Sequence, residues 1–193
     1  MSRFHTITFT PEVRAIQEQM GSRRSYARVA PQDAPDVLGP DEQAFIGERD
    51  SFYMASVGAG GWPYVQHRGG PRGFVHVLDE RTLAFADYRG NRQYISVGNL
   101  TRDDRVACMF MDYPNRARLK LLARVTMATP EQYPHVTLEP GAKTERVFVL
   151  RVEGFDWNCP QHITPRYSED EIAEILGPRI AKLEAELARL RGQ

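Results

Sequence analysis

The stretch SFYMASVGAGGWPYVQH, residues 51–67, decides the fold class of this 193-residue chain. Two runs with strand-like composition, Ser51–Val57 and residues 62–67, flank a cluster of three glycines and one alanine. Glycine adopts the positive φ angles that tight turns need, so the pattern predicts two antiparallel strands joined by a hairpin. A hairpin at this point favours an antiparallel sheet over alternating strands and helices.

Further strand-length runs repeat this arrangement on the C-terminal side. Residues 74–78 and 82–87 form a second predicted hairpin, residues 105–112 and 119–127 a third, and residues 146–155 a long final strand. About seven strands in consecutive hairpins predict a mainly β (α+β) protein, with an antiparallel sheet of six to seven strands closed into a barrel.

Helix signals lie at the periphery of this sheet. Thr10 as N-cap and Pro11 at the first helical position predict a helix that ends near Met20. Residues 22–39 predict an extended connection over the surface, because they are rich in arginine, proline and small residues without periodicity. A second short helix is expected at residues 40–48.

A long helix is expected at about residues 169–191, after a capping box formed by Ser168 and Glu171. Its leucines and isoleucines recur at spacings of four and three, as in a left-handed coiled coil. These residues are Leu176, Ile180, Leu183, Leu187 and Leu190. The stripe either packs on the chain's own barrel or pairs two copies, and Gly177-Pro178 predicts a kink before it.

Composition excludes several classes of partner. Lys plus Arg equals Asp plus Glu at 25 each, so no basic field attracts nucleic acid or an anionic membrane. The chain has neither a signal-peptide start nor a run of about 18 apolar residues. Cys108 and Cys159 suggest no disulfide framework. We therefore expect a cytoplasmic protein without nucleic-acid or membrane partners.

Common catalytic and metal motifs are absent from the sequence. There is no G-x-S-x-G, H-E-x-x-H, Walker loop or G-x-G-x-x-G after a strand. Cys159 and His162 lack a third partner, and His67, His76 and His135 suit ordinary strand or loop positions. We therefore expect no metal site.

The stretch FADYRGNRQYISVGN, residues 85–99, concentrates hydrogen-bond donors where a strand ends and a short helix begins. Such a turn suits an anion, because guanidinium groups and free backbone N–H groups both bind phosphate. A solvated surface turn is the alternative. A second turn, residues 68–73, adds two arginines and three glycines.

A cluster of functional side chains, WNCPQHITPRY, follows the last strand at residues 157–167. Trp157 offers a ring contact, Asn158 and Gln161 offer hydrogen bonds to a ring edge, and Arg166 offers a positive charge. Together with the basic turns, the cluster predicts a site for a planar ligand that bears a phosphate.

At these three segments, the chain resembles the pyridoxamine 5'-phosphate oxidase-like family of FMN-binding split β-barrels. The resemblance covers about residues 40–166 and rests on RDSFYMASVGAGGWPYVQHRGG, FADYRGNRQYI and FDWNCPQHITPRY in that order. It implies a six-stranded Greek-key split barrel, with FMN bound in a cleft between the two subunits of a homodimer. With this barrel the chain is expected to have three regions: an N-terminal helix and arm (1–39), the FMN-binding barrel (40–166), and a C-terminal helix (167–193). In a dimer, the spacing of this helix would either pair the two copies or embrace the partner barrel.

The resemblance assigns cofactor contacts by position. His67, Arg68 and Gly69 match the strand end that runs along the flavin. Ala86 and Asp87 match a pair that contacts the ribityl chain or phosphate. Asn91, Arg92 and Gln93 match positions that bind the phosphate. Gln93 stands where the oxidase has a phosphate-binding lysine, and either Arg89 or Arg72 is a candidate to replace the missing charge.

The last segment implies contacts from the second subunit. Trp157 and Arg166 match residues that approach the flavin ring, with Asn158 and Gln161 between them. The oxidase's R-x-H-D-R substrate motif is replaced here by Gln161-His162-Ile163-Thr164-Pro165-Arg166. We therefore do not expect oxidation of pyridoxamine phosphate.

The sequence thus predicts a flavin-dependent oxidoreductase acting on an unidentified small molecule, with NADPH, NADH or the substrate supplying electrons. His162 is the candidate catalytic residue, since an imidazole can relay a proton near neutral pH. The alternatives are a non-catalytic flavin-binding or sensing module, and a barrel that binds haem or deazaflavin.

Overall fold

The structure is a computed structural model that describes residues 2–26, 32–136, 141–157 and 159–191. It consists of two compact units: residues 1–111 with 118–159, and residues 112–117 with 160–193. The helices are α1 (Arg3–Thr8), α2 (Pro11–Gln19), α3 (Arg23–Tyr26), α4 (Pro40–Gly47), α5 (Ile95–Leu100) and α6 (Glu169–Arg191), with 3-10 turns η1 (Pro130–Gln132) and η2 (Pro134–Val136).

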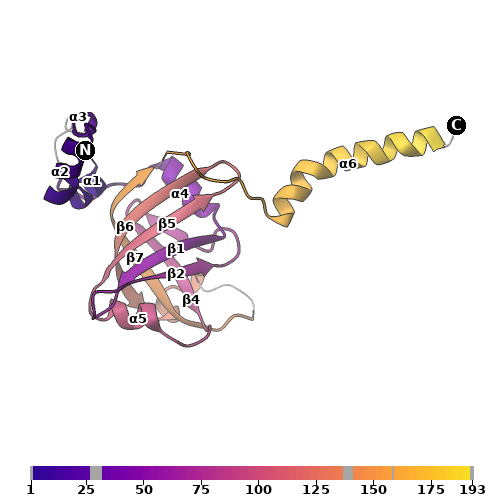
Figure 1. The fold of residues 1–193 in the computed structure, drawn as a ribbon. Helices are drawn as coiled ribbons and strands as arrows, with labels where there is room; N and C mark the ends of the chain where they lie inside the picture. Colours follow the sequence, from indigo (N-terminus) through magenta and orange to yellow (C-terminus); the bar gives the residue numbers. More distant parts are fainter. Residues whose placement is uncertain (1, 27–31, 137–140, 158, 192–193) are drawn as a thin grey trace. The chain divides into compact units, whose positions relative to one another are not determined.

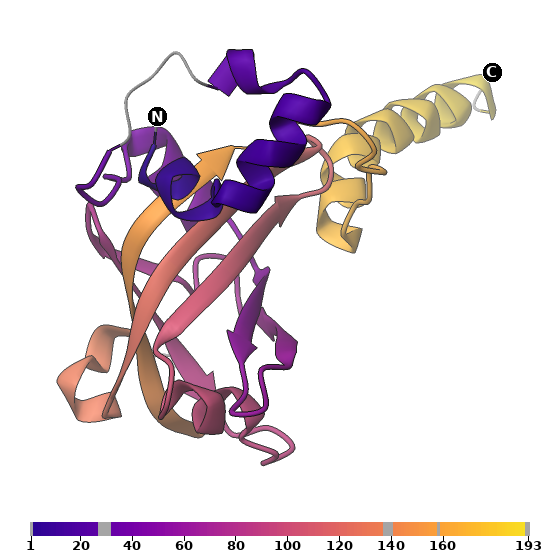
Figure 2. The same ribbon diagram turned by 60° about the vertical axis from the view of Figure 1, so that its left-hand side comes forward.

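The described residues form seven strands of one antiparallel sheet. The strands are β1 (Ser51–Val57), β2 (Pro63–Gly69), β3 (His76–Asp79), β4 (Thr82–Tyr88), β5 (Arg105–Asp112), β6 (Ala117–Ala128) and β7 (Thr144–Trp157). Their order is β2-β1-β5-β6-β7-β4-β3, so β2 and β3 are free edges and the sheet is open. Figures 1 and 2 show how the strands curve around the core. The predicted mainly β, antiparallel split-barrel fold is confirmed, but the expected closure of the sheet is wrong, because β2 and β3 do not pair with each other in the described part of the chain.

Alternating side chains explain why this sheet curls around one core. In β1 the residues Phe52, Met54 and Ser56 are buried, whereas their neighbours along the strand are not. Four fully buried phenylalanines hold the centre through stacked and edge-to-face ring contacts. These are Phe52, Phe85, Phe110 and Phe148. Burial of large aromatic rings is a major contribution to such a core.

The segment before α4 differs from the extended surface connection predicted for residues 22–39. It contains the short helix α3, and its last part is buried at Asp36 and Leu38. The Asp36 carboxylate accepts hydrogen bonds from the backbone N–H groups of Arg3 (2.9 Å), Phe4 (3.3 Å) and Phe155 (3.1 Å). The sequence did not reveal this anchor, because its three donors lie up to 119 residues away.

Contact between α1 and β7 is close enough to require glycine at residue 154. A Cβ atom at Gly154 would lie 2.5 Å from the backbone nitrogen of Phe4, which is far inside normal contact distance. The glycine thus lets the N-terminal helix approach the strand.

We expect Gly154→Ala to lower the free energy of unfolding by about 1–3 kcal/mol, because the added methyl group must displace α1. Thermal and urea denaturation measure this change. Gly47→Ala is the matched control, since a Cβ at Gly47 meets no atom within 4 Å. Equal destabilisation by the two substitutions would contradict the close approach.

The second unit contains the long C-terminal helix. Its bounds, Glu169–Arg191, agree with those predicted, and the Glu171 N–H and carboxylate exchange hydrogen bonds with Ser168 as expected for a capping box. Pro178 lies inside a continuous helix rather than at a break, and Figure 1 shows α6 bending after its first turns. No residue of α6 is buried.

Candidate functional site

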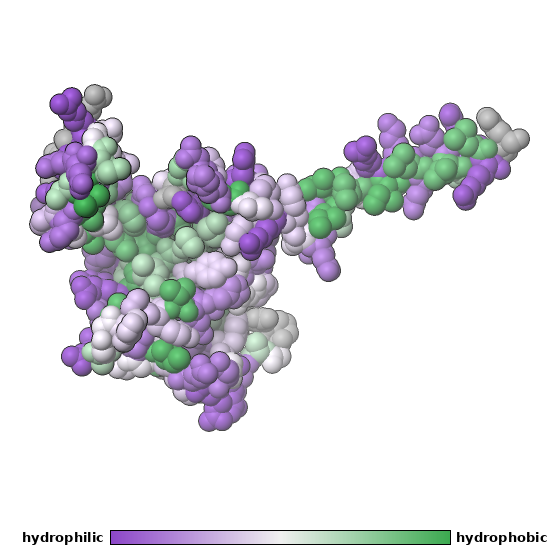
Figure 3. All heavy atoms as spheres, viewed as in Figure 1, coloured by the Kyte–Doolittle hydropathy of each residue, from purple (hydrophilic) through white to green (hydrophobic). Residues whose placement is uncertain are grey.

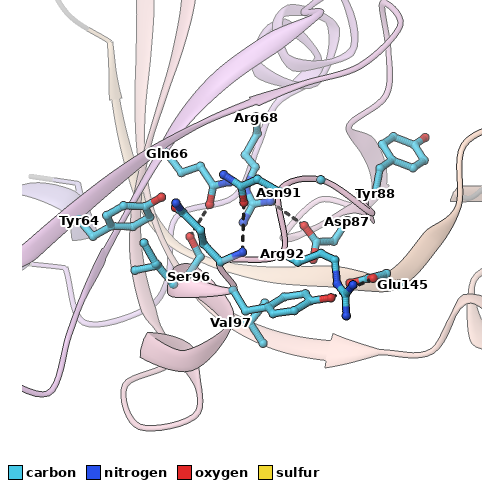
Figure 4. A pocket seen from close by; sticks show the side chains of 14 residues that line it. Tyr64, Gln66, Arg68, Asp87, Tyr88, Asn91, Arg92, Ser96, Val97 and Glu145 are labelled. Atoms are coloured by element: carbon cyan, nitrogen blue, oxygen red, sulfur yellow. Dashed lines mark hydrogen bonds and ion pairs between the residues drawn. The ribbon is translucent and has the colours of Figure 1, made fainter.

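A polar cavity of about 210 Å³ lies where β2, the end of β4 and the start of α5 meet (Figure 4). It contains much of the basic stretch picked out from the sequence. The lining residues are Tyr64, Gln66, Arg68, Asp87, Tyr88, Gly90, Asn91, Arg92, Gln93, Tyr94, Ile95, Ser96, Val97 and Glu145. Ligand pockets usually exceed about 300 Å³, so this cavity suits one end of a cofactor rather than the whole of it.

The floor of the cavity is an ion-pair network centred on Asp87. Its carboxylate accepts a hydrogen bond from Arg68 Nη1 at 2.6 Å and another from Arg146 Nη1 at 2.7 Å. The side chains of Arg68 and Asp87 are only 11% and 10% exposed. Arg68 comes from edge strand β2, whereas Asp87 comes from β4 near the opposite edge, so this pair bridges the split in the sheet.

Packing fixes the position of the Arg68 guanidinium. It lies over the rings of Phe85 and Phe148, at 5.8 and 5.1 Å from their centroids. Its Nε atom is buried and has no hydrogen-bond partner among the described residues. A buried donor without a partner is costly, so this atom is a natural contact for a bound anion or water.

The basic turn presents its side chains under backbone strain. Arg92 and Tyr94 have φ angles of 62° and 53°, which non-glycine residues adopt only at a cost. The Asn91 side-chain oxygen accepts a hydrogen bond from the Gln93 N–H at 3.1 Å, and this bond shapes the loop. Arg92 is exposed and has no hydrogen-bond or ion-pair partner in the described part of the chain.

Helix α5 is held against the sheet by two polar bonds. Ser96 donates to the Gln66 side chain at 2.8 Å, and Asn99 donates to Ser56 at 3.0 Å. Ser96 is 1% exposed, so its bond to Gln66 is shielded from water. Because both donors belong to α5, these contacts hold the α5 end of the loop between β4 and α5.

Charges around the cavity leave an excess of two positive charges. Four arginines meet two carboxylates, since Asp87 pairs with Arg68 and Arg146, and Glu145 pairs with Arg146 (3.2 Å) and Arg89 (3.9 Å). Arg92 is the fourth arginine. A phosphate monoester carries about −1.5 to −2 charges near neutral pH and would balance this excess.

Of the predicted cofactor contacts, the cavity brings together Arg68, Asp87, Asn91, Arg92 and Gln93. The fold is needed to bring these residues together, because Arg68 and Asp87 lie on strands at opposite sides of the gap between the two sheet edges. Arg72 donates to the Glu48 carbonyl at 3.1 Å, and Arg89 pairs with Glu145 at 3.9 Å. Neither arginine lines the cavity, but Arg89 contacts a residue that does.

Other predicted contacts lie outside this lining. Strand alternation directs His67 to the outer face, where its ring meets Tyr53 at 5.7 Å. Ala86 is buried beside Asp87, and Gly69 ends β2. Trp157 donates from Nε1 to Glu42 at 2.6 Å and lines a separate cavity with His5 and Tyr26.

The segment after β7 is described within the second unit. The Arg166 guanidinium lies 5.1 Å from the centroid of the Tyr113 ring, and His162 has a φ angle of 64°. Gln161 is exposed, and Asn158 lies outside the described residues. The roles assigned to these four residues therefore stay predictions.

Sequence reasoning missed the residues that complete the cavity. Tyr64 and Gln66 share a face with Arg68 on β2, so a period of two counted from Arg68 would have found them. Glu145 and Arg146 come from the start of β7, more than 50 residues after the basic turn, and only the pairing of Asp87 with Arg146 reveals them.

No group of three or more metal-binding side chains occurs among the described residues. Cys108 is buried, and burial raises the pKa of its thiol to about 12, with Arg68 opposing the shift. This thiol therefore stays protonated and inert near neutral pH.

The family model for pyridoxamine 5'-phosphate oxidase matches residues 38–156, which is more than half of the chain. The chain belongs to this family. No curated protein matches it. The match includes the sheet from β1 to β7, except for Trp157 at the end of β7, and every residue that lines the cavity.

Several solved structures are similar to this chain. One is a putative pyridoxamine 5'-phosphate oxidase from Lactobacillus delbrueckii, at 23% identity and a TM-score of 0.48, covering 62% of this chain and 93% of that one. An FMN-binding protein from Syntrophomonas wolfei has 10% identity and a TM-score of 0.48, covering 77% and 95%. HupZ from Group A Streptococcus has 12% identity and a TM-score of 0.49, covering 67% and 99%.

No helix among the described residues is both long and apolar enough to cross a membrane.

We expect Asp87→Asn to lower the free energy of unfolding by about 3–5 kcal/mol, because it leaves the buried Arg68 guanidinium without a charged partner. Chemical denaturation measures the change. Asp104→Asn, which breaks the exposed pair with Arg124, is the control and should cost about 0–1 kcal/mol. A similar loss in both variants would show that the Asp87 network does not hold the sheet edges together.

Proposed function

We propose that this protein binds FMN and acts as a flavin-dependent oxidoreductase on a small molecule, with NADPH or NADH as the reductant. The single observation that carries the proposal is a cavity lined by Arg92, which has no partner among the described residues, and by Arg68, whose buried Nε also lacks a hydrogen-bond partner there. Family membership supports a flavin as the ligand.

The cavity residues fit the phosphate end of the cofactor. Arg92 is free to form a charge-assisted pair with phosphate, and Asn91 and Gln93 add polar groups beside it. Arg68 is held by Asp87 and by two aromatic rings, so its position is set before the ligand arrives. A bound flavin supplies the hydride and electron transfer itself, while the protein binds and orients it.

Haem fits this cavity less well than flavin. Haem iron is usually held by histidine, cysteine or methionine, and the described lining contains none of these. Three tyrosines are present, and tyrosine is a rarer haem ligand. An absorption spectrum of the purified protein distinguishes the two cofactors.

A second copy of the chain is proposed to complete the site. The outer face of β2, β1 and β5 is unusually apolar for a sheet exposed to water, with rows Val65-Ala55-Ala107 and His67-Tyr53-Met109 across the strands. Val65 is 60% exposed. Figure 3 shows apolar side chains gathered on this side of the sheet. Such a face supports association, and the small cavity needs further walls to enclose a flavin ring.

The dimer proposal predicts that Met109→Glu converts the protein to monomers, because it places a charge in the apolar face. Light scattering coupled to size-exclusion chromatography measures the mass. Arg105→Gln, which makes the same change in charge at an outward position of the same strand, should leave the mass unchanged. A dimeric Met109→Glu protein would contradict the proposed interface.

We expect Arg92→Ala to weaken FMN binding by about 10- to 150-fold, the equivalent of one charge-assisted bond of about 1.5–3 kcal/mol. Quenching of flavin fluorescence measures the affinity. Arg102→Ala is the control, since Arg102 is exposed and lies outside the cavity lining. Unchanged affinity in Arg92→Ala would exclude the proposed phosphate site.

The oxidoreductase part of the proposal has its own test. Anaerobic mixing of the FMN-loaded protein with NADPH or NADH should bleach the flavin absorbance within the time of a catalytic cycle. A flavin that stays oxidised with both reductants would instead indicate a flavin-binding module that is not a nicotinamide-dependent enzyme. The candidate proton relay is tested by His162→Gln, which should slow turnover without changing flavin affinity.

A further inference from the structure

The C-terminal helix carries an apolar stripe that a single helix cannot cover. Its five large aliphatic residues are between 44% and 58% exposed, and no residue of α6 is buried. They are Leu176, Ile180, Leu183, Leu187 and Leu190. Figure 3 shows hydrophobic side chains along the length of this helix. A stripe of this kind is stable in water only when another surface covers it.

The residue types along the stripe select a particular partner. Spacings of four and three place leucine at every d position, Ile180 at the first a position of the seam and Leu187 at the second. A β-branched residue at a with leucine at d favours two parallel strands. We propose that α6 pairs with α6 of a second copy of this chain as a parallel, in-register coiled coil.

Charges that flank the stripe complement a second copy of the same helix. In a parallel pair, each g residue faces the e residue five positions later on the other helix. Arg179 at g therefore faces Glu184 of the second copy, and Glu186 at g faces Arg191 of the second copy. Both contacts join opposite charges, and the two-fold symmetry of a homodimer repeats each of them.

Other features of the helix suit the same arrangement. Pro178 falls at an outward f position, so it does not enter the seam. Two heptads are too short to pair strongly by themselves, because isolated helices of this length are marginal in water. Pairing is therefore expected in the intact protein, where the barrels of the proposed dimer hold the two helices at high effective concentration.

Disulfide trapping in the full chain tests the arrangement. In a Cys159→Ser background, Leu190→Cys places a thiol in the seam, whereas Arg189→Cys places one at an outward c position. Mild oxidation should join two copies of the Leu190→Cys protein, and the Arg189→Cys protein should stay largely uncrosslinked. Antiparallel pairing would hold the two copies of residue 190 at opposite ends of the coil. A failure to crosslink, or equal crosslinking of both variants, would overturn the proposal.

Charge exchange supplies a second test that does not disturb the apolar seam. Arg179→Glu places two glutamates together in each copy of that contact, and we expect the trapping rate of Leu190→Cys to fall about threefold or more. Adding Glu184→Arg should restore it. Within one helix, the glutamate introduced by Arg179→Glu can pair with Lys182, three residues later, and this pair stabilises the helix. A loss of trapping in this variant would therefore not result from unfolding of the helix. A double variant without recovery would overturn the parallel register.

Flavin content measured in the same samples separates this proposal from the proposed function. Trapping at residue 190 in a protein that binds no FMN would leave the coiled coil standing and remove the flavin proposal. FMN binding without trapping would leave the flavin proposal standing and remove the coiled coil.

Discussion

A buried carboxylate held between two arginines is the interaction on which the rest of this structure depends. The sheet of the described residues has two free edges, and no strand ladder among these residues joins them. The contact of Asp87 with Arg68 provides a link across the opening, while Arg146 on the neighbouring strand neutralises the second carboxylate oxygen. Because both carboxylate oxygens are engaged, the network is stable only as a unit, and removal of the acid leaves a buried positive charge.

The same network determines what the neighbouring cavity can bind. Asp87 is paired with Arg68 and Arg146 and therefore does not neutralise Arg92. The positive charge of Arg92 thus faces solvent without a partner among the described residues. Strained backbone at Arg92 and Tyr94 is the kind of local cost that proteins retain at binding sites. The proposed phosphate site therefore follows from a structural constraint, and the proposed redox chemistry follows from the cofactor that this site would hold.

Much of this could be predicted from the sequence, and the limits have physical causes. Alternation in β1 and the glycines after it identified the antiparallel sheet, and the capping box at Ser168 located the start of α6. The basic turn at Arg92 was visible because its residues are adjacent in the chain. Contacts between distant strands were not visible: Asp36 with Phe155, and Asp87 with Arg146, depend on pairings that no local pattern specifies. The place of Glu145 in the site could not be predicted for the same reason.

Recognition of a phosphate attached to a flavin is the proposed role of the cavity. Comparing FMN with riboflavin tests it most directly, since the two ligands share the ring and ribityl chain and differ only in the phosphate. Titration of the cofactor-free protein should give an affinity for FMN at least about tenfold above that for riboflavin, corresponding to about 1.4 kcal/mol or more from charge-assisted bonds. The difference should shrink as salt concentration rises, because the cavity is open to solvent. Equal affinities for the two flavins would contradict the account.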